Sequence, residues 1–248
     1  MKNVKDSHTI AYFNDYVPEY PLSRFEPALK VINQYGNNES TFLDVGCGAG
    51  NVLDFIRDTT IVRDVYGMDV SSNCLVKTRE RVGCQTFLGS ILDDNFIEAV
   101  PQKFDFILLA AVLHHLIGKT RRECRILASR SIENCLNLLN ESGFLIIMEP
   151  IFCPVIVMDM IFYMKKLVTH LTSKRIHIFN KRSNIGAPVV SYYTDKQLFE
   201  MIGCAKNCKV VDVATHDITL APLWRLAMIN RRANTTIVVK KQRTVMSQ

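Results

Sequence analysis

The sequence predicts an α/β protein built on a mostly parallel β-sheet with helices on both faces, and three observations predict it. First, the largely apolar residues 42–45 stop at glycines 46, 48 and 50, and helical spacing begins at Val52. This order is typical of a strand, a glycine loop and a helix. Second, another apolar run ends at Asp69. Third, residues 104–110 are apolar almost throughout, as a central parallel strand buried on both faces should be.

The glycine loop has the spacing G-x-G-x-G over residues 46–50. It differs from the G-x-G-x-x-G of a dinucleotide site, and no Gly-Lys-Ser/Thr follows as in a phosphate-binding P-loop. Glycine lets a ligand lie directly on the backbone, and the amide groups at the start of a helix then face that ligand. The loop therefore indicates a ligand that carries no pyrophosphate.

Two acidic residues accompany the loop. Asp69 ends the second strand, 19 residues after Gly50, where a carboxylate can accept both hydroxyls of a ribose. Asp44 precedes the loop and offers a carboxylate to an ammonium group. Together they suit a ligand with a ribose and an amino-acid tail.

The remaining elements follow from periodicity and capping residues. An aromatic-rich segment, 9–35, is expected to be helical. The other predicted helices are 71–81, 119–140 and 195–202, the last with a capping box at Thr194 and Gln197; the other strands are 84–88, 144–148, 209–213 and 236–240.

Length and composition indicate one globular domain over 1–248. The polar N-terminus carries no apolar signal-peptide core. The eight cysteines form no C-x-x-C pair, so we expect reduced cysteines in a cytoplasmic protein. No His, Asp and Glu set has metal-ligand spacing, so no metal is predicted.

Positive charge is concentrated in one segment. The net charge is +6, and residues 160–194 hold six Lys or Arg and no acid. An apolar stretch, 151–164, leads into this segment and is too short to span a bilayer. An amphipathic element at an anionic membrane surface and a helix that covers the site with solvated lysines both explain it.

Four motifs carry a resemblance to a known family: L-D-V-G-C-G-A-G at 43–50, the acid Asp69, F-D-F-I-L-L-A-A-V-L-H-H-L at 104–116 and G-F-L-I-I-M-E-P at 143–150. In this order they resemble the class I S-adenosylmethionine-dependent methyltransferases. The resemblance implies a Rossmann-like seven-stranded sheet whose last strands form an antiparallel hairpin. S-adenosylmethionine also fits the ligand deduced above. The implied cofactor-binding residues are Asp44, Gly46, Cys47, Gly48, Gly50, Asp69, Val70, Ser90, Ile91 and Ala110. Ser90 stands where the family often places an Asp.

The resemblance implies methyl transfer to a small or lipid-like acceptor, which we expect at oxygen. The candidate bases are His114, His115 and Glu149. Histidine titrates in the right range, and we select His115; a histidine hydrogen-bonded to the backbone that shapes the loop is the alternative. Glu149 is expected to bind substrate or to cap a helix. One of the two histidines should face the ligand and the other the protein. Residues 1–40 are expected to form a lid with Tyr12 and Tyr16, and residues 151–192 a cover for the acceptor site. Peripheral contact with an anionic membrane is a further expectation.

Two other functions stay open. The basic segment is compatible with an RNA or other nucleic-acid methyltransferase, although it has few interleaved aromatics and the Asn/Asp-Pro-Pro-Tyr motif of base-amino methyltransferases is missing. An inactive cofactor-binding scaffold is the other alternative, and the intact glycine loop and Asp69 argue against it.

Overall fold

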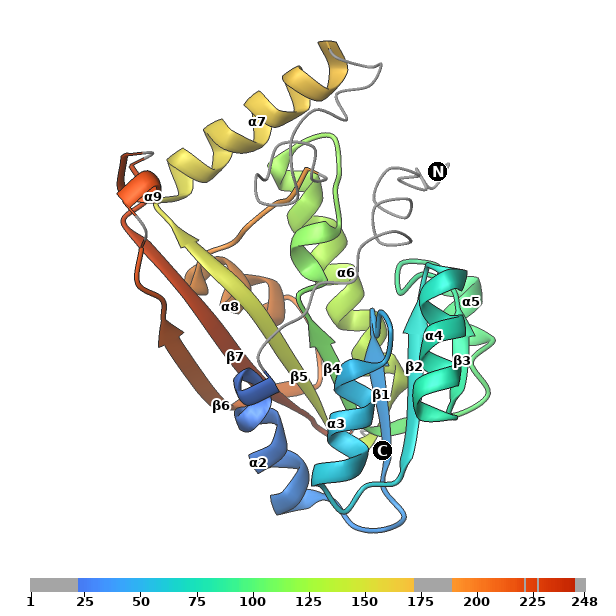
Figure 1. The fold of residues 1–248 in the computed structure, drawn as a ribbon. Helices are drawn as coiled ribbons and strands as arrows, with labels where there is room; N and C mark the ends of the chain where they lie inside the picture. Colours follow the sequence, from blue (N-terminus) through green and yellow to red (C-terminus); the bar gives the residue numbers. More distant parts are fainter. Residues whose placement is uncertain (1–21, 172–188, 221, 227, 244–248) are drawn as a thin grey trace, which may run out of the picture.

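The computed structural model describes residues 22–171, 189–220, 222–226 and 228–243 (Figure 1). Its strands are β1 (Thr41–Val45), β2 (Asp64–Asp69), β3 (Gln85–Leu88), β4 (Phe104–Ala110), β5 (Leu139–Cys153), β6 (Cys208–Asp217) and β7 (Arg231–Lys241). They form a seven-stranded sheet with the order β3-β2-β1-β4-β5-β7-β6. Neighbours from β3 to β5 are parallel, and β7 is antiparallel to both β5 and β6. The predicted sheet and its terminal hairpin are thus confirmed.

The helices cover both faces of the sheet (Figure 1). They are η1 (Leu22–Phe25), α2 (Glu26–Tyr35), α3 (Asn51–Thr59), α4 (Ser72–Val82), α5 (Asp94–Glu98), η2 (Leu113–His115), α6 (Arg121–Leu138), α7 (Val155–Leu171), α8 (Asp195–Gly203) and α9 (Pro222–Leu226). Side chains alternate along β4, so Phe106 and Leu108 pack with α2, α3 and α4, while Ile107 and Leu109 pack with α6 and α8.

Capping residues set several helix boundaries where the sequence predicts them. The Ser71 hydroxyl accepts from the Cys74 amide at the start of α4, and Gly83 ends that helix in a left-handed conformation. Thr194 and Gln197 form the predicted capping box of α8. The short helices α5 and α9 were not predicted, and β5 is longer than predicted because it pairs with β7 as far as Cys153.

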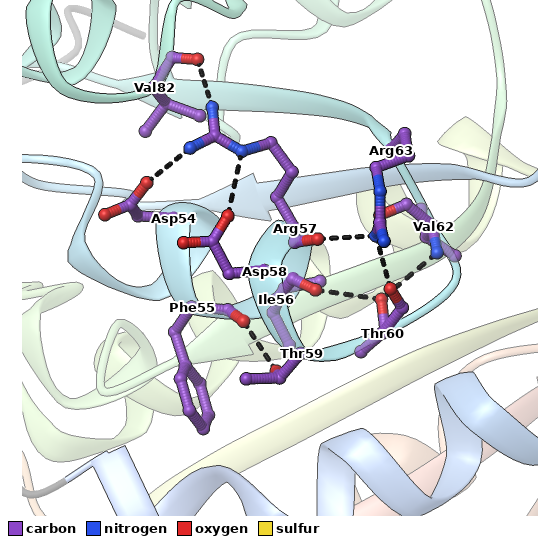
Figure 2. A network of polar contacts seen from close by, with 10 residues as sticks. All are labelled: Asp54, Phe55, Ile56, Arg57, Asp58, Thr59, Thr60, Val62, Arg63 and Val82. Atoms are coloured by element: carbon purple, nitrogen blue, oxygen red, sulfur yellow. Dashed lines mark hydrogen bonds and ion pairs between the residues drawn. The ribbon is translucent and has the colours of Figure 1, made fainter.

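A network of polar contacts holds α3, the helix that follows the glycine loop (Figure 2). The Arg57 guanidinium donates to the Val82 carbonyl at the end of α4 at 2.5 Å and to Asp54 at 2.7 Å. Arg63 in turn donates to the carbonyls of Arg57 and Thr60. These contacts fix α3 against α4 and, through α3, the end of the loop.

Some expectations lie outside the described residues. They are the lid residues Tyr12 and Tyr16 and the basic residues Lys174, Arg175, Lys181 and Arg182. Among the described residues, no helix is long and apolar enough to cross a membrane.

Candidate cofactor and acceptor site

The predicted site residues gather at the carboxyl ends of the parallel strands. The loop after β1, Asp69 at the end of β2 and Ala110 at the end of β4 share this edge, which is where open α/β sheets bind ligands. Glu149 lies one residue beyond Met148, the last β5 residue paired with β4. β5 itself continues because its antiparallel partner β7 continues.

The glycines of the loop have different reasons to be glycine. Gly46 and Gly48 have φ of 78° and 55°, in the region that side chains disfavour. A Cβ on Gly46 would lie 2.6 Å from Val112 Cγ2, whereas one on Gly48 would meet no heavy atom within 4 Å. The packing of the chain therefore requires glycine at 46, while Gly48 faces open space above the loop.

Asp69 joins the loop to β2. Its carboxylate accepts from the Gly48 amide at 3.0 Å and from the Ser71 amide at 2.8 Å. Burial raises the pKa of Asp69, and these hydrogen bonds oppose that rise. A carboxylate has about four acceptor positions, so Asp69 retains capacity for ligand hydroxyls.

Asp44 is a buried carboxyl group, only 3% exposed. Among the described residues no hydrogen bond or ion pair involves its side chain. Burial, and then the charge of Asp69, raise its pKa to about 7. A buried acid beside a second acid favours a positively charged partner, and a ligand cation would supply one.

The other implied cofactor residues differ in what they can offer. The Cys47 thiol points into the protein, 3.8 Å from the Thr78 hydroxyl. Only the backbone of Cys47 is therefore left to contact a ligand. Val70 is 43% exposed directly after Asp69. The Ser90 hydroxyl accepts from the Leu92 amide at 3.2 Å. Ile91 is buried in the core and its carbonyl accepts from Asn134, which leaves its amide. Ala110 is partly exposed.

Glu149 contacts the segment that carries the two histidines. Its carboxylate, 1% exposed, accepts from the Leu113 amide at 2.7 Å and lies 2.6 Å from His114 Nδ1. Glu149 thus accepts a backbone hydrogen bond from the first residue of η2. The rings of His114 and His115 lie 4.1 Å apart. Burial, and then His114, lower the pKa of His115 well below 6.5, so His115 is neutral at pH 7.

Sequence reasoning missed Arg121, which connects the cover to the site. This side chain is buried at the first residue of α6. Its guanidinium donates to Asp159 of α7 at 2.8 Å, to the Ser191 hydroxyl at 2.5 Å and to the Tyr192 carbonyl at 2.5 Å. The Ser191 amide donates to the His114 carbonyl at 2.8 Å. An arginine in the first helical turn, unfavourable for the helix dipole, was the only signal in the sequence.

Comparison with known proteins agrees with this geometry. Residues 43–145 match the family model described as a methyltransferase domain. This match covers 103 of the 248 residues and supports the predicted resemblance to the class I S-adenosylmethionine-dependent methyltransferases.

Two named relatives match parts of the chain. A protein of Encephalitozoon cuniculi named as a methyltransferase is 29% identical over 46% of this chain and 47% of its own length. The mitochondrial ubiquinone biosynthesis O-methyltransferase of Saccharomyces cerevisiae is 22% identical over 74% of this chain and 57% of its own. The chain thus spans about half the length of these relatives.

Solved structures share the fold over nearly the whole chain. The N-methyltransferase NodS of Bradyrhizobium japonicum, in complex with S-adenosylhomocysteine, has a TM-score of 0.60 at 13% identity and covers 98% of this chain and 100% of its own. Magnesium protoporphyrin IX methyltransferase of Synechocystis, also with S-adenosylhomocysteine, has a TM-score of 0.58 at 11% identity, with 96% and 95% covered. At these identities the likeness concerns the fold.

Proposed function

We propose that this protein is an S-adenosylmethionine-dependent methyltransferase that methylates a small or lipid-like acceptor at oxygen. The observation that carries the proposal is the loop around Gly48. The Gly48 amide donates to the Asp69 carboxylate, the space above Gly48 is open, and the buried Asp44 stands four residues earlier in the chain.

The residues present fit this cofactor. Asp44 is suited to its positive charge, Asp69 to its ribose hydroxyls, and the Gly48 backbone to close approach. Val70, Ser90 and the Ile91 amide lie after β2 and β3 and would hold the adenine side, with Ala110 at the end of β4. When bound, S-adenosylmethionine supplies a methyl group on a sulfonium, ready for displacement.

The chain itself contributes positioning and proton removal. Holding the acceptor in line can supply on the order of 7–11 kcal/mol. His115 would accept the hydroxyl proton, since its lowered pKa keeps the imidazole neutral at pH 7. Glu149 fixes His114, and His114 packs on His115. Residues 1–40 and 151–192 would cover the site and exclude water.

One named relative supports the acceptor class. The mitochondrial relative of Saccharomyces cerevisiae is named for ubiquinone biosynthesis and for O-methylation. Its name favours methyl transfer to oxygen of a small-molecule acceptor.

A pair of glycine variants tests the cofactor site. Gly48→Ala should weaken S-adenosylhomocysteine binding by about tenfold or more in calorimetry, because the new methyl group occupies the space above the loop. Gly83→Ala is the matched control: Gly83 also has positive φ and no heavy atom within 4 Å of a Cβ. Both variants carry a similar backbone cost of about 1–2 kcal/mol. Equal affinity in both variants, or tighter binding of NAD by the parent, would contradict the proposal.

Labelled methyl transfer tests the acceptor. With labelled S-adenosylmethionine and cell extract, the label should appear in the lipid or small-molecule fraction as an alkali-stable ether. Label in RNA would favour a nucleic-acid methyltransferase instead. Binding without any transfer would favour the inactive scaffold.

A further inference from the structure

Helix α7 presents an apolar face to solvent. Ile156, Met160, Tyr163, Met164 and Leu167 are each 48–69% exposed, and we call them the α7 face. Their spacing of 4, 3, 1 and 3 residues places them on one side of a helix. Contiguous exposed apolar side chains of this kind mark interaction surfaces.

The opposite side of α7 is held by the body of the protein. Val157, Met158 and Phe162 are buried, and the first two pack with Ile229. Arg121 binds Asp159, and the Lys166 ammonium donates to the Gly118 and Lys119 carbonyls at 2.9 Å each. These contacts keep the α7 face turned outward.

The α7 face lies beside the candidate site. α7 starts two residues after the end of β5 (Figure 1). Arg121 joins Asp159 of α7 to Ser191, whose amide donates to the His114 carbonyl. Near the start of α7, Leu226 and Met228 are 82% and 66% exposed, just before the buried Ile229 in the chain.

The positive charge near the α7 face in the sequence favours an anionic partner for this surface. The α7 face has no charged member, while residues 160–194 hold six Lys or Arg and no acid. Arg225, beside Leu226, is exposed. A second copy of the chain would add further positive charge, whereas an anionic bilayer would neutralise it.

We propose that the α7 face docks on the surface of an anionic phospholipid bilayer. It rests on the proposed function in one respect: a lipid-like acceptor would reach the site from the bilayer beside it. With one side of α7 packed on the protein, the helix lies along the membrane surface and inserts only its apolar side chains.

Co-sedimentation with vesicles tests this proposal. The probes are vesicles of phosphatidylcholine with and without phosphatidylglycerol. The parent should bind the anionic vesicles, and binding should weaken as salt rises. Met160→Gln/Met164→Gln/Leu167→Gln should lower the partition coefficient by about tenfold or more. The matched control is Val76→Gln/Ile126→Gln/Val213→Gln, at three residues 44–57% exposed elsewhere, and it should bind like the parent.

Each other outcome has a definite meaning. Equal vesicle binding by the parent and the α7 triple variant overturns the proposal, as does no binding by the parent. A parent dimer that the triple variant abolishes in sedimentation equilibrium overturns it in favour of self-association. S-adenosylhomocysteine affinity should be the same in all three proteins. Vesicle binding without cofactor binding would contradict the proposed function alone, and cofactor binding without vesicle binding the membrane inference alone.

Discussion

Asp44 combines burial, an acidic neighbour and a pKa of about 7, against an ordinary value of 3.8. As the pH rises from about 4 to about 7, the unfolded chain releases this proton while the folded chain keeps it. The contribution of Asp44 to stability is therefore favourable at low pH and lost across this window. An ionised carboxylate that destabilises the ligand-free protein is expected at a site where a bound ligand supplies the compensating positive charge.

Asp44→Asn should therefore separate stability from binding. At pH 8 it should raise the free energy of unfolding of the ligand-free protein by roughly 2–4 kcal/mol, because the buried charge is gone. The gain should shrink at pH 5, and affinity for S-adenosylmethionine should fall. Urea denaturation at both pH values and calorimetry measure the two effects. A variant less stable than the parent at pH 8 would show that the folded protein compensates the Asp44 charge.

The proposed role of His115 as the base predicts how its substitution changes kcat. If it accepts the acceptor proton, His115→Ala should lower kcat by about 10²–10⁴-fold and leave S-adenosylhomocysteine affinity unchanged. Because its pKa lies well below 6.5, kcat of the parent should be flat above pH 6.5 and fall only in more acidic solution. Steady-state rates and calorimetry provide the measurement. Loss of cofactor binding or of folding in the variant would assign His115 a structural role.

Among the elements, α6 anchors the cover through one buried side chain. Arg121→Gln should lower the free energy of unfolding by about 2–4 kcal/mol, since it removes three hydrogen bonds from a buried guanidinium. Arg130→Gln, on the same helix, is the control: its ion pair with Asp94 is about half exposed and should be worth at most about 1 kcal/mol. Urea denaturation compares the two, and equal losses would contradict a special role for Arg121.

Local sequence patterns predicted the elements whose causes are local. The glycine loop, the strand ends at Val45 and Asp69 and the cap at Thr194 depend on neighbouring residues. The extension of β5 to Cys153 depends on β7, about 80 positions later in the chain. Helices α5 and α9 have five residues each, too few for a periodic pattern.

The same distinction applies to the site. Asp44, Gly48 and Asp69 belong to motifs that can be read in order. The Glu149–His114 contact joins residues 35 positions apart, and Arg121 reaches Ser191 across 70. Such contacts arise from the packing of several elements at one edge of the sheet, and no local sequence pattern predicts them.

In the whole molecule, the sheet separates two hydrophobic core clusters, and the candidate site residues lie at one edge of that sheet. The buried clusters on the two faces contain β-strand side chains in alternation. The loop, both acids, the histidine pair and the start of α7 all lie at the carboxyl ends of the parallel strands. The fold therefore brings the predicted site residues and the start of α7 to one edge of the sheet.

The continuation of β5 beyond its parallel partner has a mechanical consequence. From Glu149 to Cys153 the strand is paired with β7, and α7 begins at Val155. Four residues of extended strand measure about 13 Å. A displacement of α7 would therefore be transmitted along this hydrogen-bonded strand to Glu149, whose carboxylate contacts His114.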